Sequence, residues 1–232
     1  MKVTIQEHTT KKPITMMGRE AGICWGADLS SQEKNYKRGL QCLDDGHGRV
    51  LEYPQIYFVL EDCSARMMRE LYTHIGGGPS RLQASTRYID YAKDFAYIIP
   101  PKIESNPEAK EIYVEAMESI AESLRKLNAL EAPREDIANL LPLGMKSTMV
   151  MRTNLRHLID MSRQRMCTRA YWEYRDFMNV LVRELAAYDE EYQFVVEHFF
   201  GPKCDFLGYC PEKFSCGRWE KGSTRKKDRK NQ

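Results

Sequence analysis

The chain lacks any run of apolar residues long enough to cross a membrane, although hydrophobic residues make up 42% of its 232 positions. That share is enough for a folded core. The first residues, MKVTIQEHTTKKP, lack the apolar core of a signal peptide. Seven cysteines without a secretion signal favour a reducing compartment. We therefore predict a cytoplasmic protein without a membrane partner.

The chain also lacks a CxxC pair, the knuckle that structural zinc sites favour. Four potential ligands, His198, Cys204, Cys210 and Cys216, nevertheless follow one another at intervals of six residues. Four nitrogen or sulfur ligands suffice for a structural zinc ion. We interpret the cysteines as reduced thiols and predict no metal site. A zinc-stabilised binding module is the alternative.

A large excess of one charge is missing, because 35 Lys and Arg residues face 33 Asp and Glu residues. The exception is the stretch KGSTRKKDRKNQ, residues 221–232, which holds six basic residues and one acidic residue. We predict that this tail is disordered and that nucleic acid is an unlikely partner, with a nucleic-acid-binding module as the alternative. The predicted organisation is a domain over 1–200, a Cys-containing extension over 201–220 and the basic tail over 221–232.

No internal repeat and no regular alternation of strands and helices is present, which favours the α+β class over a doubly wound sheet. Patterns of two-residue period predict strands, and patterns of 3.6-residue period predict helices. Asp62 and Thr153 are expected to cap the helices that follow them. We expect strands at 3–8, 55–61, 86–91, 95–99 and 147–151, and helices at 14–25, 33–45, 63–74, 107–129, 153–165 and 168–199.

The stretch GGGPSRLQASTRY, residues 76–88, combines glycines with a polar run. A phosphate-binding glycine loop precedes a helix, whereas these glycines follow one. We interpret them as a helix C-cap and flexible spacer, with a phosphate cradle as the alternative. Ser85 and Arg87 lie two residues apart and would share one face of an extended segment. A hydroxyl and a guanidinium there can bind phosphate, although a solvated strand edge has the same pattern.

The predicted helix after Thr153 carries two sets of polar residues. Arg156, Asp160 and Arg163 fall at i, i+4 and i+7, which is one stripe. Asn154 and Arg165 lie eleven residues apart and share another face. These residues indicate either a binding surface or a solvated face on which Arg156 and Asp160 form an ion pair.

The run SRLQASTRY resembles the signature of the flavin-dependent thymidylate synthases, with matches at Ser80, Ser85, Arg87 and Tyr88, and His74 resembles the histidine that precedes it. HGRVLEY, at 47–53, and LPLGMKSTMVMRTNLRHLIDMSRQR, at 141–165, resemble two further segments of that family. The blocks occur in the family's order and cover roughly residues 1–200. The chain departs from the family pattern at Thr73, Ile75 and Ala138, where the family has arginines, and at Leu82 and Gln83, where it has Asn and Glu; Arg134 lies near Ala138 but out of register.

The resemblance implies a central, mostly antiparallel sheet flanked by long helices, in a homotetramer with active sites between subunits. It implies reductive methylation of dUMP to dTMP, with methylenetetrahydrofolate as carbon donor and an FAD hydride regenerated by NADPH. A side chain cannot deliver a hydride, so the flavin must supply it. The resemblance also implies that no cysteine acts as nucleophile.

The resemblance further assigns roles to residues at matching positions. Arg165 is implied as the catalytic residue, because it matches an arginine that faces the uracil ring. The implied dUMP-binding residues are Glu70, Gln83, Ala84, Ser85, Thr86, Arg87 and Arg165. The implied FAD-binding residues are His47, Arg49, Thr73, His74, Ile75, Gln83, Asn154, Arg156 and Asp160.

Overall fold

A computed structural model describes residues 1–93 and 95–222 of the chain, and it divides into two compact units. The first, the sheet unit, consists of Met1–Thr10 and Gln55–Asn154. The second, the helical unit, consists of Lys11–Pro54 and the described residues from Leu155 on. Residues 223–232 of the predicted basic tail lie outside the described residues. The helices of the described part include none long and apolar enough to span a bilayer.

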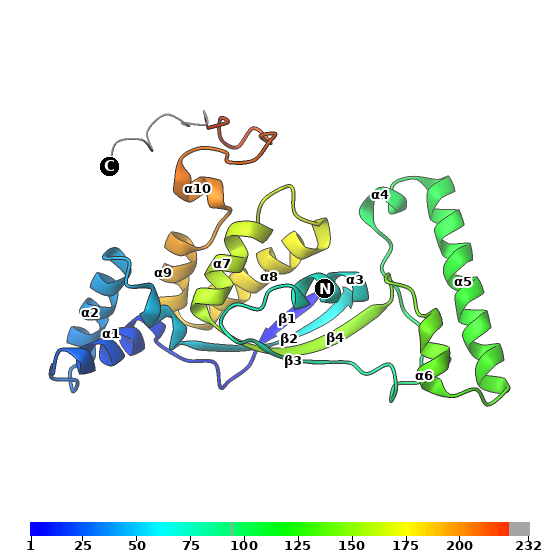
Figure 1. Ribbon diagram of the computed structural model, residues 1–232, viewed down its shortest axis with the longest axis horizontal. Helices are drawn as coiled ribbons and strands as arrows, with labels where there is room; N and C mark the ends of the chain where they lie inside the picture. Colours follow the sequence, from blue (N-terminus) through cyan, green and yellow to red (C-terminus); the bar gives the residue numbers. More distant parts are fainter. Residues whose placement is uncertain (94, 223–232) are drawn as a thin grey trace, which may run out of the picture. The chain divides into compact units, whose positions relative to one another are not determined.

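The sheet unit contains one antiparallel sheet with the strand order β1-β2-β4-β3 (Figure 1). Its strands are β1 (Lys2–Ile5), β2 (Gln55–Ser64), β3 (Ser80–Gln83) and β4 (Lys146–Asn154). The antiparallel sheet with many helices confirms the predicted α+β class. Alternate residues of β2 are buried, with Ile56, Phe58 and Leu60 fully inaccessible. Each such side chain contributes about 1.5–3 kcal/mol of burial free energy, so this face anchors the sheet.

The strands predicted at 86–91 and 95–99 are wrong. Residues 86–88 form a turn, and Tyr97 makes only an isolated bridge to Met145. The turn satisfies its own backbone, because Ser85 Oγ accepts from the N–H of Arg87 at 3.2 Å and Ser85 O accepts from the N–H of Ile89 at 3.2 Å. A segment whose polar groups pair locally gains nothing from joining a sheet.

Both predicted helix caps are also wrong, because β2 and β4 run further than expected. Asp62 sits in a β-bulge between Leu60 and Cys63 with φ 56°, and its carboxylate pairs with Lys146 at 3.1 Å. The cap of α3 (Ala65–Tyr72) is Ser64, whose hydroxyl accepts from the N–H of Met67 at 3.1 Å. Thr153 is buried inside β4, and α7 (Leu155–Arg165) starts two residues later.

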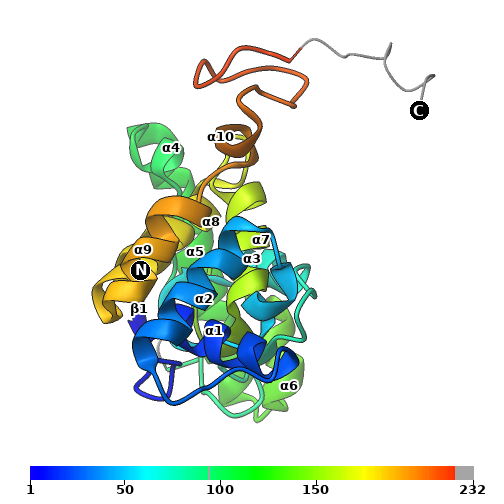
Figure 2. The ribbon, with the colours of Figure 1, turned by 90° about the vertical axis from the view of Figure 1, so that its left-hand side faces the viewer.

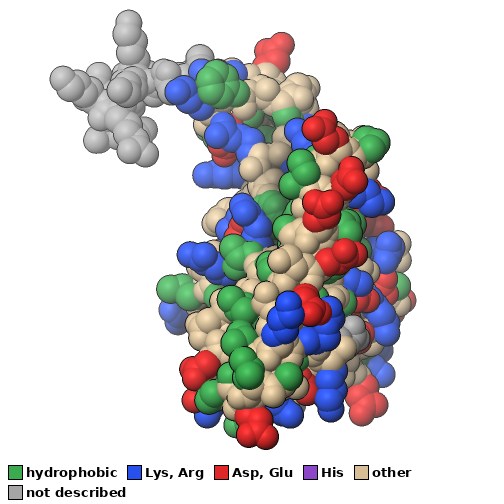
Figure 3. All heavy atoms as spheres, turned by 90° about the vertical axis from the view of Figure 1, so that its right-hand side faces the viewer, with side chains coloured by type: hydrophobic (Ala, Val, Ile, Leu, Met, Phe, Trp, Pro, Cys, Tyr) green, Lys and Arg blue, Asp and Glu red, His purple; other side chains and the backbone are tan. Residues whose placement is uncertain are grey.

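The other regular elements of the sheet unit are helices, and the predicted long helix is present as α5 (Pro107–Ala129). Asn106 caps α5 by accepting from the N–H of Ala109 at 3.2 Å. Only Met117 and Leu124 of α5 are buried, so most of this helix faces outward. Figure 3 views the face that carries α5 and shows charged side chains of both signs among hydrophobic ones. The neighbouring elements are α4 (Pro101–Glu104), α6 (Arg134–Ile137) and η2 (Ala138–Leu140).

In the helical unit, α1 (Pro13–Cys24) and α2 (Gln32–Asp44) match the predicted helices and pack side by side (Figures 1 and 2). The predicted single helix over 168–199 is instead two helices, α8 (Trp172–Tyr188) and α9 (Glu190–Phe199). The remaining elements are η1 (Gly48–Glu52), α7 and α10 (Lys203–Leu207).

The break between α8 and α9 lies at Asp189, which is extended with φ −159° and ψ 141°. Its carboxylate caps α9 by accepting from the N–H of Glu191 at 3.0 Å, and it accepts from the N–H of Lys12 at 3.2 Å. The buried carboxylate of Glu191 accepts from the N–H of Thr15 at 2.8 Å and from its hydroxyl. Carboxylates from this junction thus satisfy the first N–H groups of α1, which a continuous helix could not do.

Two glycines set the distance between α1 and α2. A Cβ on Gly18 would lie 1.8 Å from the carbonyl oxygen of Asn35, and one on Gly39 would lie 2.0 Å from that of Ile14. Backbone atoms cannot rotate away as the end of a side chain can. The two helices therefore pack this closely only because both positions are glycine.

We expect Gly39→Ala to destabilise the protein by about 2 kcal/mol, because overpacking against fixed backbone outweighs the gain in helix propensity. The thermal midpoint, followed by circular dichroism, should fall by roughly 4–8 °C. Gln41→Ala, at an exposed position of the same helix, is the matched control and should change stability by less than about 0.5 kcal/mol. A rise in the midpoint of Gly39→Ala, as propensity alone predicts, would contradict the close-packing argument.

Candidate functional site

The residues singled out in the sequence fall into two groups, one in each unit. The sheet unit holds a first group on α3, β3, the turn after β3 and the end of β4, consisting of Glu70, Thr73, His74, Ile75, Gln83, Ala84, Ser85, Thr86, Arg87 and Asn154. The helical unit holds a second group on η1 and α7, consisting of His47, Arg49, Arg156, Asp160 and Arg165.

In the first group, the glycine run forms a turn that side chains of β4 hold in place. The C-cap of α3 is Thr73, not the first glycine, so the predicted capping position is wrong. Gly77 and Gly78 have φ of 71° and 58°, which glycine adopts without strain. The amide of Asn154 donates to the carbonyl of Gly77 at 3.3 Å, and Arg152 donates to that of Gly78 at 3.2 Å. The turn presents carbonyl groups to these donors, which suits a positioned turn better than an anion cradle.

Arg81 places a positive charge near the two positions where the sequence has lost arginines. Its guanidinium donates to the carbonyl of His74 and lies 5.3 Å from the ring centroid of Tyr72. Thr73 and Ile75 flank His74 and are exposed, with Ile75 78% accessible. Sequence reasoning missed Arg81, although it lies inside the signature run beside Ser80.

The predicted phosphate-binding residues lie on the turn that follows β3. Gln83 donates to the hydroxyl of Ser147 at 3.2 Å, and the N–H of Ala84 donates to the carbonyl of Thr148 at 2.8 Å, so both residues tie the turn to β4. Ser85 and Arg87 do not share a strand face. The local hydrogen bond from the N–H of Arg87 to the hydroxyl of Ser85 brings them together instead.

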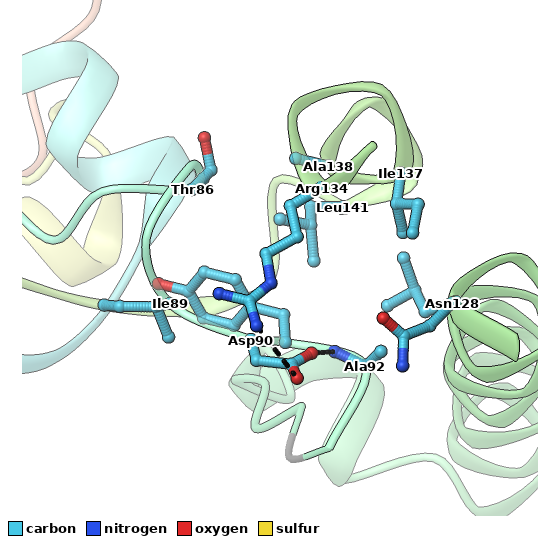
Figure 4. A pocket seen from close by; sticks show the side chains of 11 residues that line it. Thr86, Ile89, Asp90, Ala92, Asn128, Arg134, Ile137, Ala138 and Leu141 are labelled. Carbon is cyan, nitrogen blue, oxygen red and sulfur yellow. Dashed lines mark hydrogen bonds and ion pairs between the residues drawn. The ribbon is translucent and has the colours of Figure 1, made fainter. Parts of the chain in front are cut away.

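The guanidinium of Arg87 is exposed and pairs with Glu135 of α6 at 3.0 Å. Arg134, which precedes Glu135 in α6, also points toward the turn after β3, as Figure 4 shows. Arg134 donates to the carbonyl of Tyr88 at 3.3 Å and lies 3.8 Å from Asp90. Arg134 and Ala138 line the same small pocket with Thr86, although only Ala138 is in register with the family arginine. This pocket, of about 20 Å³, has room for a water molecule but not for a nucleotide.

In the second group, an ion pair joins η1 to the start of α7. Nη1 of Arg156 lies 2.6 Å from Oε1 of Glu52. The ion-pair partner of Arg156 is therefore Glu52, and not Asp160 as in one of the two interpretations that the sequence left open. A Cβ on Gly48 would lie 3.8 Å from the guanidinium carbon of Arg156, so the backbone of η1 passes close beside this side chain. The exposed side chains of His47 and Arg49 belong to the same short segment. Sequence reasoning missed Glu52, which only the fold brings to Arg156.

Arg165 lies in the last turn of α7, and its guanidinium carbon is 4.7 Å from the ring centroid of Tyr174. Tyr174 is fully buried, which fixes the surface on which the guanidinium stacks. Arg163 stacks in a similar way on Phe206, at 4.3 Å. Both arginines line a pocket of about 490 Å³ in the helical unit, here named the C-terminal pocket because residues 202–219 form much of its wall.

Four of the seven cysteines also line the C-terminal pocket, namely Cys167, Cys204, Cys210 and Cys216. Burial raises the pKa of the Cys204 thiol. A hydrogen bond with the side chain of Thr168 lowers the pKa of the exposed Cys216 thiol. Within residues 1–93 and 95–222, no three His, Cys, Asp or Glu side chains are placed so that they could hold a metal ion together.

Comparisons with known proteins agree on one family. The family model described as thymidylate synthase complementing protein matches residues 5–189. A flavin-dependent thymidylate synthase of Nitratidesulfovibrio vulgaris is 32% identical over 214 residues, covering 84% of this chain and 82% of the relative. One from Clostridium tetani is 28% identical and covers 94% of both chains. The crystal structure of a flavin-dependent thymidylate synthase from Helicobacter pylori, complexed with FAD and dUMP, matches with a TM-score of 0.68 at 20% identity, over 86% of this chain and all of that one.

Proposed function

Because the chain belongs to the thymidylate synthase complementing protein family, we propose that it is a flavin-dependent thymidylate synthase that converts dUMP to dTMP with FAD as cofactor. The observation that carries this conclusion is the family match over residues 5–189, which spans both groups of site residues. We further propose methylenetetrahydrofolate as carbon donor, NADPH as reductant and a cytoplasmic location. The seven cysteines all lie among the described residues and are present as thiols, which is consistent with a reducing compartment.

The residues of the second group fit the phosphates of a flavin dinucleotide. Arg49 and Arg156 supply guanidinium groups, whose fork of N–H donors matches phosphate oxygens. The pair with Glu52 holds Arg156 beside η1, whose backbone at Gly48 passes close to this arginine. His47 and Asp160 add donor and acceptor groups on the same two elements. FAD, when bound, supplies the hydride that no side chain of the chain can deliver.

Residues of the first group fit the phosphate of dUMP. Arg87 must leave Glu135 to bind it, and an exposed ion pair of this kind is worth only about 0–1 kcal/mol. A phosphate dianion offers the guanidinium a stronger, charge-assisted contact. Ser85 and Thr86 carry hydroxyls on the same turn, and Arg134 adds a second positive charge beside it. Glu70 and Gln83 complete the proposed substrate contacts.

Arg165 fits the role of activating the uracil ring. Negative charge must develop on the ring carbonyl and N3 when C5 becomes nucleophilic. Stacking on the buried ring of Tyr174 fixes the plane of the guanidinium, so its charge is in position before the reaction begins. A fixed charge stabilises developing charge without a cost of reorganisation. A cysteine nucleophile has no part in this scheme.

A homotetramer is the proposed assembly, with each active site completed by a second subunit. Apolar side chains that a lone chain leaves exposed support it. Ile112 of α5 and Leu130 at its C-cap are 63% and 77% accessible, and Leu82 and Tyr88 near the proposed phosphate site are 75% and 77% accessible. Exposed apolar groups of this number favour burial against another chain. Light scattering coupled to size exclusion measures the subunit number directly.

The test of the proposed function combines a spectrum with a product assay. Purified protein supplemented with FAD should bind the flavin, and it should form dTMP from dUMP, methylenetetrahydrofolate and NADPH. Omitting any one component should stop product formation. Protein that binds no flavin and unfolds with chelator would favour the zinc-stabilised module, and steeply salt-dependent DNA binding that is lost on removal of residues 221–232 would favour the nucleic-acid binder.

A further inference from the structure

The C-terminal pocket has a composition that the rest of the chain does not share. Five of its lining residues are cations, Arg163, Arg165, Arg169, Lys203 and Arg218, and Glu212 is the single acidic residue among them. The whole chain, in contrast, is nearly balanced, with 35 basic and 33 acidic residues. The volume of the C-terminal pocket, about 490 Å³, falls within the range of small-molecule sites. The pocket is therefore suited to a ligand with several negative charges.

Ion pairs hold several of these cations in place, and these ion pairs are exposed to solvent rather than buried. Asp205 accepts from Arg218 at 2.7 Å and from the indole N–H of Trp219 at 2.8 Å, which sets a guanidinium beside an aromatic ring. Arg169 lies 3.5 Å from Glu212. Both ion pairs are about half exposed, so they give way to a stronger anion at little cost. The buried Nε of Arg163 has no hydrogen-bond partner among the described residues, which is costly unless a ligand supplies one.

Aromatic rings lie beside the charges. Phe214 and Trp219 line the pocket and remain 70% and 38% accessible. An exposed aromatic face can stack on a purine base, and arginine forks match phosphate oxygens better than they match scattered carboxylates. The combination favours a phosphorylated purine nucleoside over a simple carboxylate anion.

We propose that the C-terminal pocket binds the adenosine half of NADPH, with its 2′-phosphate and pyrophosphate on Arg163, Arg169, Arg218 and Lys203, while Arg165 stays on the uracil ring. The inference rests on the proposed function, which requires a reductant but has given it no site. The chain contains no G-x-G-x-x-G sequence, so the usual glycine-rich turn for a dinucleotide is not present. A 2′-phosphate adds close to two negative charges at neutral pH, and the cation excess of the pocket distinguishes the phosphorylated dinucleotide from the unphosphorylated one.

The position of the pocket along α7 agrees with a reductant that must reach the flavin. Arg156 and Asp160, proposed to contact FAD, lie in the first half of this helix, and Arg163 and Arg165 lie at its end. Seven residues separate Arg156 from Arg163, a rise of about 10 Å along the axis. A dinucleotide anchored at the end of α7 by its adenosine half is long enough to reach the first half of the same helix with its other half.

The decisive experiment measures binding to the protein itself. Adenosine 2′,5′-bisphosphate is titrated calorimetrically into the full chain, into the double variant Lys203→Ala/Arg218→Ala and into the control Lys213→Ala. The control removes a charge from the same segment but from outside the pocket lining. We expect the dissociation constant to rise at least about tenfold in the double variant and to stay within about twofold in the control. Arg169→Ala, on the α7–α8 connection, repeats the test should the C-terminal segment rearrange.

Flavin reduction under anaerobic conditions provides the second measurement. In the double variant the half-saturating concentration of NADPH should rise by about the same factor, whereas that of NADH, which has the pyrophosphate but lacks the 2′-phosphate, should rise less. Equal binding of the bisphosphate by the double variant and the control would overturn the proposal. A double variant in which only the half-saturating concentration of methylenetetrahydrofolate for dTMP formation rises would also overturn it, because the pocket would then bind the folate carboxylates. If the protein forms dTMP but gives either of these results, the proposed NADPH site is wrong and the proposed function stands. If the protein binds the bisphosphate but neither binds flavin nor forms dTMP, the proposed function is wrong.

Discussion

Arg165→Ala is expected to lower the rate of dTMP formation by at least about a hundredfold, the usual loss when one preorganised electrostatic group is removed. The side chain is the charge proposed to stabilise the electron-rich uracil, and its stacking on Tyr174 holds it ready for that role. The measurement is turnover at saturating dUMP, with bound flavin quantified from the spectrum.

Two controls separate chemistry from folding in this variant. The lost stacking on Tyr174 is worth about 0.5–2 kcal/mol, and Arg165→Ala is expected to remain folded by circular dichroism and to keep its subunit number. Arg165→Lys keeps the charge but loses the planar fork, and its rate should fall between those of the wild type and Arg165→Ala. Wild-type turnover in Arg165→Ala at saturating dUMP would show that the assigned role is wrong.

Arg87→Ala is expected to weaken dUMP binding by about 2–3 kcal/mol, which corresponds to a rise of roughly thirty- to over a hundredfold in the dissociation constant. The guanidinium is proposed to exchange its exposed partner Glu135 for the phosphate. Titration of dUMP, followed by flavin fluorescence, measures the change. Deoxyuridine lacks the phosphate, so its weak binding should hardly change in Arg87→Ala.

Glu135→Ala and Gly77→Ala are the matched controls for this prediction. Glu135→Ala removes the competing carboxylate and leaves Arg87 in place, so it should bind dUMP as well as the wild type or slightly better. Gly77→Ala forces an alanine to φ 71° and should reduce stability by about 1–2 kcal/mol before it affects binding. The opposite result, with dUMP lost selectively in Gly77→Ala and retained in Arg87→Ala, would make the glycines a phosphate cradle.

The parts of the fold that could be predicted from the sequence are those where local pattern and packing agree. Pro107 at the start of α5 and Asn106 at its cap mark a boundary that the structure keeps. The turn after β3 was predicted as strand because Ile89, Tyr91 and similar residues have strand propensity. Propensity carries no information on the hydroxyl of Ser85, which closes the turn. The break at Asp189 had a visible signal, since an aspartate followed by two glutamates is a helix start.

The site could be predicted residue by residue only where a motif names it. The ion pair of Arg156 with Glu52 joins positions 104 residues apart, and that of Arg87 with Glu135 joins an unpredicted turn to a short helix. Arg134 illustrates the same limit. It is out of register with Ala138 in the sequence, yet both line one pocket with Thr86. Distances of this kind follow from the path of the chain, which periodicity and spacing do not contain.

The contacts at the start of α1 can form only late in the synthesis of the protein. Lys12 and Thr15 donate to Asp189 and Glu191, which lie 177 and 176 residues further along the chain. A ribosome has therefore released α1 and α2 long before their partners exist, and Gln55–Asn154, the larger part of the sheet unit, emerges in between. The helical unit is completed only when α9 has been made, and closing so long a loop slows folding. Until residues 189–191 have been made, the first turn of α1 therefore lacks the carboxylates that accept its N–H groups.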